Sequence, residues 1–356
     1  MCIDRGVYLL KSVSIYSFIH ALVDLSCVFS LNHIVSILGY NNSELILLVA
    51  VLYNFLAFAL QLPIGFLADK LNKNRYISIL GCFLVSLGML CAFLVEGYFL
   101  FLPVLLVGLG NAFFHIGGGI DILNISNGKA SLPGIYVSTG ALGLFFGNYV
   151  GFNLSSFICL FSLLMLSIIL LFYLDVFEKL PDNMPFKINK PTVNQNFVLL
   201  FLFSAVCLRS FTGFAVSFDW KNSFFVGLLS TLCVVFGKLL GGIIGDKYGW
   251  SKVSNLSLYL ASFLFIFAPS NMLSGLFGLF LFNMTMPLTL TALSNTFPNS
   301  KGMAFGLTTV ALFLGYILEI LLSPYIDNLS GSLVLLVCGL LSLLVMHLGL
   351  KYYKKG

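Results

Sequence analysis

The sequence predicts an all-α integral membrane protein with twelve transmembrane helices, divided six and six. Of its 356 residues, 59% are hydrophobic and 37 are Phe, and the mean hydropathy is +1.04. A water-soluble domain of this length cannot bury so much apolar surface. The apolar residues fall into about twelve runs, each close to the roughly 20 residues that cross a bilayer core. One longer polar connection separates the first six runs from the last six.

The spans are expected to begin near residues 7, 43, 76, 98, 133, 156, 197, 222, 251, 272, 302 and 331. The first run contains His20 and Asp24 and has no small-residue cleavage site, so it is expected to be a span and not a signal peptide. The polar connection at 173–196 contains three prolines and mixed charge. We therefore expect six-helix halves at 1–174 and 197–356, joined by a cytoplasmic linker at 175–196.

The basic residues are distributed unequally between the two sides that an even number of spans defines. One side carries fourteen of them and the other carries only Lys221. This bias predicts that both termini are cytoplasmic. The net charge of +5 then reflects topology, and no nucleic-acid partner is expected. The fourteen are Arg5, Lys70, Lys73, Arg75, Lys129, Lys179, Lys187, Lys190, Lys247, Lys252, Lys301, Lys351, Lys354 and Lys355.

A charged turn occurs twice, as "GFLADKLNKNR" at 65–75 and "GIIGDKYGWSK" at 242–252. Its two aspartates are 177 residues apart (246 − 69), half the chain, and each turn follows an even-numbered span. We expect each Asp to face the positive end of the next helix, and the glycines to let backbones approach closely. A loop that only obeys topology rules is the alternative reading of one copy. The residues concerned are Gly65, Asp69, Lys70, Lys73 and Arg75 in the first turn, and Gly242, Asp246, Lys247 and Lys252 in the second.

Both turns resemble the signature G-x-L-A-D-[KR]-x-G-[KR]-x-[KR] of the major facilitator superfamily. That family carries it between spans 2 and 3, with a degenerate copy between spans 8 and 9. Asn72 occupies the position of the second glycine of this signature, and Asn, like glycine, tolerates a left-handed backbone. The resemblance covers essentially the whole chain. It implies two six-helix bundles around a central cavity that opens alternately to each side, with the aspartates and cations of the turns acting as a cytoplasmic latch.

Finer motifs resemble the fosmidomycin-resistance-type members of that superfamily. "FIHALVDLS" in span 1 carries their His-x-x-x-Asp as His20 and Asp24, and "GLGNAFFHIGGG" in span 4 ends their glycine-rich stretch with His115. "GKASLPGIYVSTGALGLFFGNYVG" resembles their next loop and span 5. Ile116 replaces the proline that follows the histidine in those proteins, and no acidic residue follows within the glycine run.

The same residues are candidates on chemical grounds. His20 and Asp24 are four residues apart and share one helix face, and a carboxylate inside a bilayer is a functional candidate by default. A structural hydrogen-bonded pair is the alternative. The family architecture places His115 beside span 1. Only the His20–Asp24 spacing supports a metal site made from the three, so no metal is expected.

Two cations also fall inside spans. Arg209 lies near the middle of span 7 and needs a carboxylate, backbone carbonyls or an anionic substrate group, because its guanidinium stays charged. Asp24 and Glu319 are its candidate protein partners. Lys238 is expected to reach the cytoplasmic face or to join the latch.

These patterns indicate a secondary active transporter of a small organic solute, working as a monomer in the cell (inner) membrane. Proton coupling is expected because Asp24, Glu319 and the histidines are titratable groups at depth, and Asp24 is expected to carry the proton. The glycine-rich span 5 is a weak indication of export. No cofactor and no enzymatic activity are expected, since the sequence has no phosphate-binding loop and no catalytic arrangement. The alternative is a transporter-like membrane sensor or assembly protein without flux.

Overall fold

The computed structural model describes residues 2–39, 42–94, 97–177, 180–187, 190–215, 218–326 and 330–354, without the side chains of 2–8, 97–98 and 175–177. Three of the predicted cytoplasmic cations are affected, because Lys179, Lys355 and the side chain of Arg5 lie outside the described residues.

Every expected span of the first half is helical. The helices are α1 (Cys2–Leu38), α2 (Ser43–Asn54), α3 (Gln61–Leu71), α4 (Asn74–Leu94), α5 (Phe101–Ile125), α6 (Ser131–Gly147) and α7 (Leu154–Phe177), with a π-helical turn η1 (Phe55–Ala59) and a 3-10 turn η2 (Gly97–Leu100). The second span is the unit α2–η1–α3, irregular in its middle. Asn72 ends it in the left-handed conformation with φ of 50°, the backbone that a glycine would adopt most easily.

The second half repeats this pattern. Its helices are α8 (Val193–Ala215), α9 (Phe224–Tyr248), α10 (Trp250–Phe265), α11 (Met272–Asn283), α12 (Met286–Thr296), α13 (Lys301–Ile326) and α14 (Gly331–Tyr353). The tenth span is the unit α11–α12, and the first turn of α12 contains Pro287, a residue that cannot donate a backbone hydrogen bond. Since α7 continues to Phe177 and α8 begins at Val193, the connection between the halves is shorter than the expected 175–196.

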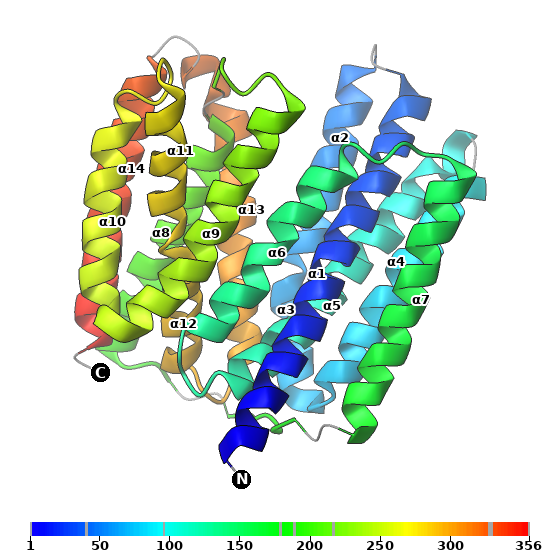
Figure 1. Cartoon of the computed structure of the whole chain (residues 1–356), viewed down its shortest axis with the longest axis horizontal. Coiled ribbons are helices and arrows are strands. Elements are labelled where there is room, and N and C mark those ends of the chain that lie inside the picture. Colours follow the sequence, from blue (N-terminus) through cyan, green and yellow to red (C-terminus); the bar gives the residue numbers. More distant parts are fainter. Residues whose placement is uncertain are drawn as a thin grey trace.

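The helices form two bundles side by side, with the first half of the chain in one and the second half in the other (Figure 1). Within the described residues, ten units are long and apolar enough to cross a membrane, and α6 and α10 are shorter. The predicted all-α membrane fold with twelve spans in two six-helix bundles is confirmed. Both ends of the chain lie on the same side of the molecule (Figure 1). We call this side the terminal side.

Close backbone contacts hold the two bundles together near the terminal side. Gly65 on α3 lies so near Gly302 on α13 that a Cβ on either residue would collide with the carbonyl of the other. At the equivalent place in the other half, Gly242 on α9 lies against the carbonyl of Ala130, just before α6. Only glycine allows these approaches. The repeated glycines of the charged turns therefore mark where the bundles meet.

Candidate functional site

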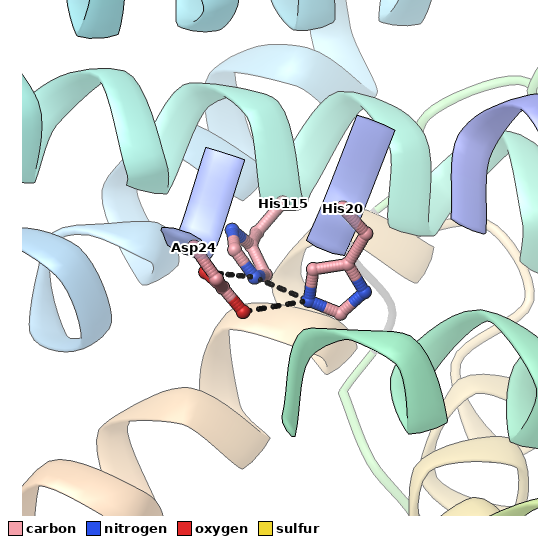
Figure 2. Close-up of side chains that lie close together, drawn as sticks. All are labelled: His20, Asp24 and His115. Atoms are coloured by element: carbon pink, nitrogen blue, oxygen red, sulfur yellow. Dashed lines mark hydrogen bonds and ion pairs between the residues drawn. The ribbon is translucent and has the colours of Figure 1, made fainter. Parts of the chain in front are cut away.

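A buried polar cluster connects α1 and α5 in the N-terminal bundle (Figure 2). The Nε2 atoms of His20 and His115 are 2.8 Å apart. The carboxylate of Asp24 lies 3.3 Å from Nε2 of His20 and 3.6 Å from Nε2 of His115. All three residues are at most 9% exposed. The structure thus brings together the three residues that the sequence predicted on adjacent spans.

Hydrogen bonds fix the tautomers of both imidazoles. Nδ1 of His20 is 2.8 Å from the carbonyl oxygen of Tyr136, and Nδ1 of His115 is 2.8 Å from that of Asn111. A carbonyl only accepts, so each Nδ1 must carry a hydrogen. The two Nε2 atoms would then face each other with lone pairs unless one of them holds an additional proton. A hydrogen bond across this 2.8 Å contact would need one additional proton, and the carboxylate of Asp24 lies beside both rings.

Asn111 completes the cluster by donating from Nδ2 to Asp24 Oδ1 over 2.9 Å. Among the described residues, His20, Asp24 and His115 are the group whose potential metal-ligating atoms lie within 4.8 Å of one another. Two nitrogens bound to a tetrahedral zinc ion would be about 3.3 Å apart, given zinc–nitrogen distances of about 2.0–2.1 Å. The observed 2.8 Å is a hydrogen-bond distance instead.

Arg209 on α8 lies in the C-terminal bundle and pairs with neither of its candidate carboxylates. Its guanidinium donates to Thr285 Oγ1 at 3.3 Å and to Thr289 Oγ1 at 3.5 Å. Glu319, on α13, is half-buried. Arg209 also lines a cavity of about 530 Å³ in its own bundle, which extends to Lys221 in the loop before α9.

The sequence predicts that Lys238 either reaches the cytoplasmic face or joins the latch. Its ammonium donates to the carbonyl of Val137 on α6, in the other bundle, at 3.4 Å. The charges of both Arg209 and Asp24 act on it. Lys238 therefore belongs to the C-terminal bundle but contacts the N-terminal bundle. The sequence gives no sign of this contact, because Val137 is 101 residues away.

Asp69 caps a helix of the opposite bundle. Its Oδ1 accepts from the backbone N–H of Gly302 at 2.8 Å, and its Oδ2 accepts from that of Met303 at 2.9 Å, at the start of α13. Lys301, beside them, donates to the carbonyl of Leu123 in the N-terminal bundle at 3.1 Å. The expectation that Asp69 faces the next helix was wrong, because the first turn of α13 offers it two unpaired backbone donors.

Asp246 makes the equivalent contact in the other direction. Its two carboxylate oxygens accept from the backbone N–H groups of Ala130 at 2.9 Å and Ser131 at 2.8 Å, at the start of α6. Trp250 Nε1 also donates to Oδ1 at 2.9 Å. Here too the partner is a helix of the opposite bundle and not the next helix. The half-chain repeat thus produces two reciprocal helix caps between the bundles.

The cations of the turns have different surroundings. Lys70 lies 4.3 Å from the ring centre of Phe66, and Lys73 and Lys247 lie over neighbouring tyrosine rings. Lys252 is exposed. Arg75 is buried instead, and it donates to the carbonyl of Leu174 at 2.8 Å. The lysines are therefore surface groups, whereas Arg75 ties α4 to α7 within one bundle.

Asp121 on α5 is a buried carboxylate that sequence analysis overlooked. Its Oδ2 accepts from the hydroxyl of Tyr16 at 2.6 Å and lies 3.6 Å from Nε of Arg75, while its Oδ1 accepts from Asn74 at 2.8 Å. The only sequence signal was its place at the end of an apolar glycine run. This network joins three helices near the terminal side.

Comparisons with known proteins agree with this architecture. The family model of the Major Facilitator Superfamily matches residues 13–318. No curated protein sequence is significantly similar to the chain. Among solved structures, the chain is similar to FucP, a Major Facilitator Superfamily transporter in the outward conformation, with 13% identity, a TM-score of 0.71, and coverage of 96% of this chain and 99% of that one.

Two further solved structures are similar. One is a variant of the E. coli fucose:proton symporter FucP, with 13% identity, a TM-score of 0.62, and coverage of 94% of this chain and 99% of that one. The other is the human organic anion transporter MFSD10 (TETRAN), with 14% identity, a TM-score of 0.73, and coverage of 96% and 99%. At these identities the likeness shows the fold alone.

Proposed function

Because the chain belongs to the Major Facilitator Superfamily, we propose that it moves a small organic solute across the membrane by alternating access, coupled to protons. Membership in this family makes it a multi-pass membrane transporter and not an enzyme. A fucose:proton symporter shares the fold, which makes proton coupling compatible with this architecture. The finer likeness to fosmidomycin-resistance-type transporters rests on the motifs around His20, Asp24 and His115.

The observation that carries the proton assignment is the contact between the two histidines. Both Nδ1 atoms donate to backbone carbonyls, so the 2.8 Å separation of the Nε2 atoms needs a proton between them. The sequence alone favoured Asp24 as the carrier. We infer instead that the histidine pair carries the proton and that Asp24 is its ionised counter-ion.

Loss of this proton supplies a driving force for the conformational change. Without it, two imidazole lone pairs and a carboxylate face one another in a buried site, which is electrostatically unfavourable. Lys238 is the nearby cation of the other bundle, and the charge of Asp24 already acts on it. Deprotonation therefore strengthens the attraction between Asp24 and Lys238 and favours one arrangement of the bundles, as coupling requires.

We also propose that the two helix caps form the latch that closes one side of the transporter. Asp69 and Asp246 each join one bundle to the start of a helix in the other, so both caps must break when that side opens. The cation bias assigns this side to the cytoplasm of a cell (inner) membrane, with both termini cytoplasmic. A topology reporter fused after Lys190 should accordingly be cytoplasmic. A monomer suffices, since both halves of the pathway lie in one chain.

Flux assays in proteoliposomes test the function. A panel of small anions, sugars, amino acids and drugs is offered with and without a pH gradient. Wild-type protein should accumulate at least one solute in response to the gradient. Asp24→Asn and His115→Gln should abolish this accumulation but keep solute-for-solute exchange, which needs no proton cycle. His347→Gln is the matched control, because His347 is exposed on α14, away from the cluster.

Unchanged gradient-driven accumulation in both cluster variants would refute the proton assignment. An absence of flux for every solute would favour the alternative of a membrane sensor or assembly protein. Export and import are separated by the same assay, from the direction of the gradient that drives accumulation.

A further inference from the structure

The C-terminal bundle contains two cations that its own side chains do not neutralise. Arg209 donates only to the hydroxyls of Thr285 and Thr289, and Lys238 donates only to the carbonyl of Val137. Among the described residues, no carboxylate lies within ion-pairing distance of either cation. Neutral oxygens orient a cation but do not balance its charge. An anion that binds beside Arg209 or Lys238 would supply the missing negative charge.

A cavity leads to one of these cations. It has a volume of about 530 Å³, within the range of small-molecule sites. Arg209 lies in its wall at depth, and the exposed Lys221, the one cation of the side opposite the termini in our topology, lies at its outer end. Asp219, two residues before Lys221, does not line the cavity. The positive charges therefore favour entry of an anion from the side opposite the termini.

The remaining wall indicates what accompanies the anionic group. Phe214, Phe218, Phe265 and Phe282 line the cavity together with Ser230 and Thr231. Aromatic rings favour an apolar body, while the guanidinium fork matches a carboxylate or phosphonate with two parallel hydrogen bonds. Thr212 and Asn283 are further polar side chains of the wall, so the cavity can also form hydrogen bonds with polar groups of the anion.

We propose that this cavity binds a small organic anion with an apolar body, whose carboxylate, phosphonate or sulfonate lies against Arg209. This inference rests on the proposed transport function and names the class of its cargo. Ser230 and Thr231 lie on α9, about two turns before Lys238. Neutralising Arg209 removes one of the two charges that act on Lys238 and leaves Asp24 as the other. Substrate binding and the proton site are thereby connected through Lys238.

Thermal stabilisation of the purified protein tests this without requiring transport. The probes are benzoate, phenylphosphonate, benzenesulfonate, succinate and hexanoate, each compared with its uncharged amide or alcohol. At least one acid should raise the Tm of the wild type, and its neutral counterpart should not. The effect should be lost in Arg209→Gln, partly retained in Arg209→Lys and weakened in Lys221→Gln. Lys187→Gln, which removes an exposed lysine of the linker, should retain it.

The outcomes separate the two proposals. Equal stabilisation by the neutral compounds, an undiminished response in Arg209→Gln, or no response to any acid would each overturn the anion site. The measurement uses no gradient, so acid binding that depends on Arg209 would stand even if proton coupling failed in proteoliposomes. Conversely, gradient-driven transport of a neutral solute would leave the proton site intact and reject this cargo.

Discussion

The two bundles hold their buried charges in different ways. In the N-terminal bundle, Arg75 lies 3.6 Å from Asp121, and that carboxylate also accepts from Tyr16 and Asn74. In the described part of the C-terminal bundle, Arg209 donates to the hydroxyl groups of Thr285 and Thr289. The first cation is paired with a carboxylate, whereas the second contacts neutral hydroxyl groups. The two bundles therefore share a fold but differ in how they pair a buried arginine. The bundle that contains Arg209 is the one in which we expect a charged cargo to bind.

The two helix caps that form the proposed latch are similar in the two bundles. Asp69 and Asp246 each cap the first turn of a helix across the interface, and a glycine four residues before each Asp lies against the opposite backbone. The two halves thus share the same helix cap and glycine contact at their interface, whereas their interiors differ. Perturbing the interior should give unequal results in the two bundles, and perturbing the latches should give similar ones.

The largest effect is expected for Asp121→Ala. The substitution leaves Arg75 buried without its carboxylate, and removal of one partner of a buried ion pair costs about 3–5 kcal/mol of stability. The Tm in detergent should fall by several degrees. Asp121→Asn should lose less, because an amide still accepts from Asn74. A Tm equal to that of the wild type in Asp121→Ala would show that the charges of this bundle are not balanced by this network.

Smaller effects are expected for Asp69→Asn and Asp246→Asn. Each replaces charged acceptors by a neutral amide at a helix N-terminus, and a hydrogen bond to a charged group contributes about 1.5–3 kcal/mol. Both variants should be inserted and folded but should cycle more slowly, measured as the initial transport rate at equal protein. If both variants transported at the wild-type rate, the repeated turn would have a role in membrane topology only. A defect in only one would break the likeness between the halves.

Replacing the glycines at the interface by a larger residue tests the same contact between the bundles. Gly65→Ala and Gly242→Ala place a methyl group against an opposing backbone, and such overpacking costs about 1–3 kcal/mol. The terminal side should then open more often, measured as a longer distance between spin labels at Leu71 and Pro298 in a chain without native cysteines. Gly151→Ala is the control, because a Cβ there meets only an ordinary contact. Unchanged distances in both variants would remove these contacts from the latch.

Sequence reasoning reached the fold because hydropathy, charge bias and the repeat are local signals. It also brought His20, Asp24 and His115 together, since one pair shares a helix face and a family motif placed the third. It could not find the partners of Asp69, because Gly302 is 233 residues away and the capping groups are backbone N–H donors that any sequence provides. Asp121 was missed for a similar reason, as its partner Tyr16 is 105 residues away.

The smallest effect on stability is expected for Arg209→Met, and it sharpens the comparison most. Removing this guanidinium leaves no orphaned partner, because Thr285 and Thr289 also donate to backbone carbonyls of their own span. The desolvation of an unbalanced cation disappears at the same time, and a methionine fills a similar volume. The Tm should therefore stay constant or rise slightly, in contrast to the loss in Asp121→Ala. A fall of comparable size would mean that Arg209 is balanced by the fold itself. An unchanged Tm together with lost acid binding would identify Arg209 as a residue kept for its cargo at the expense of stability.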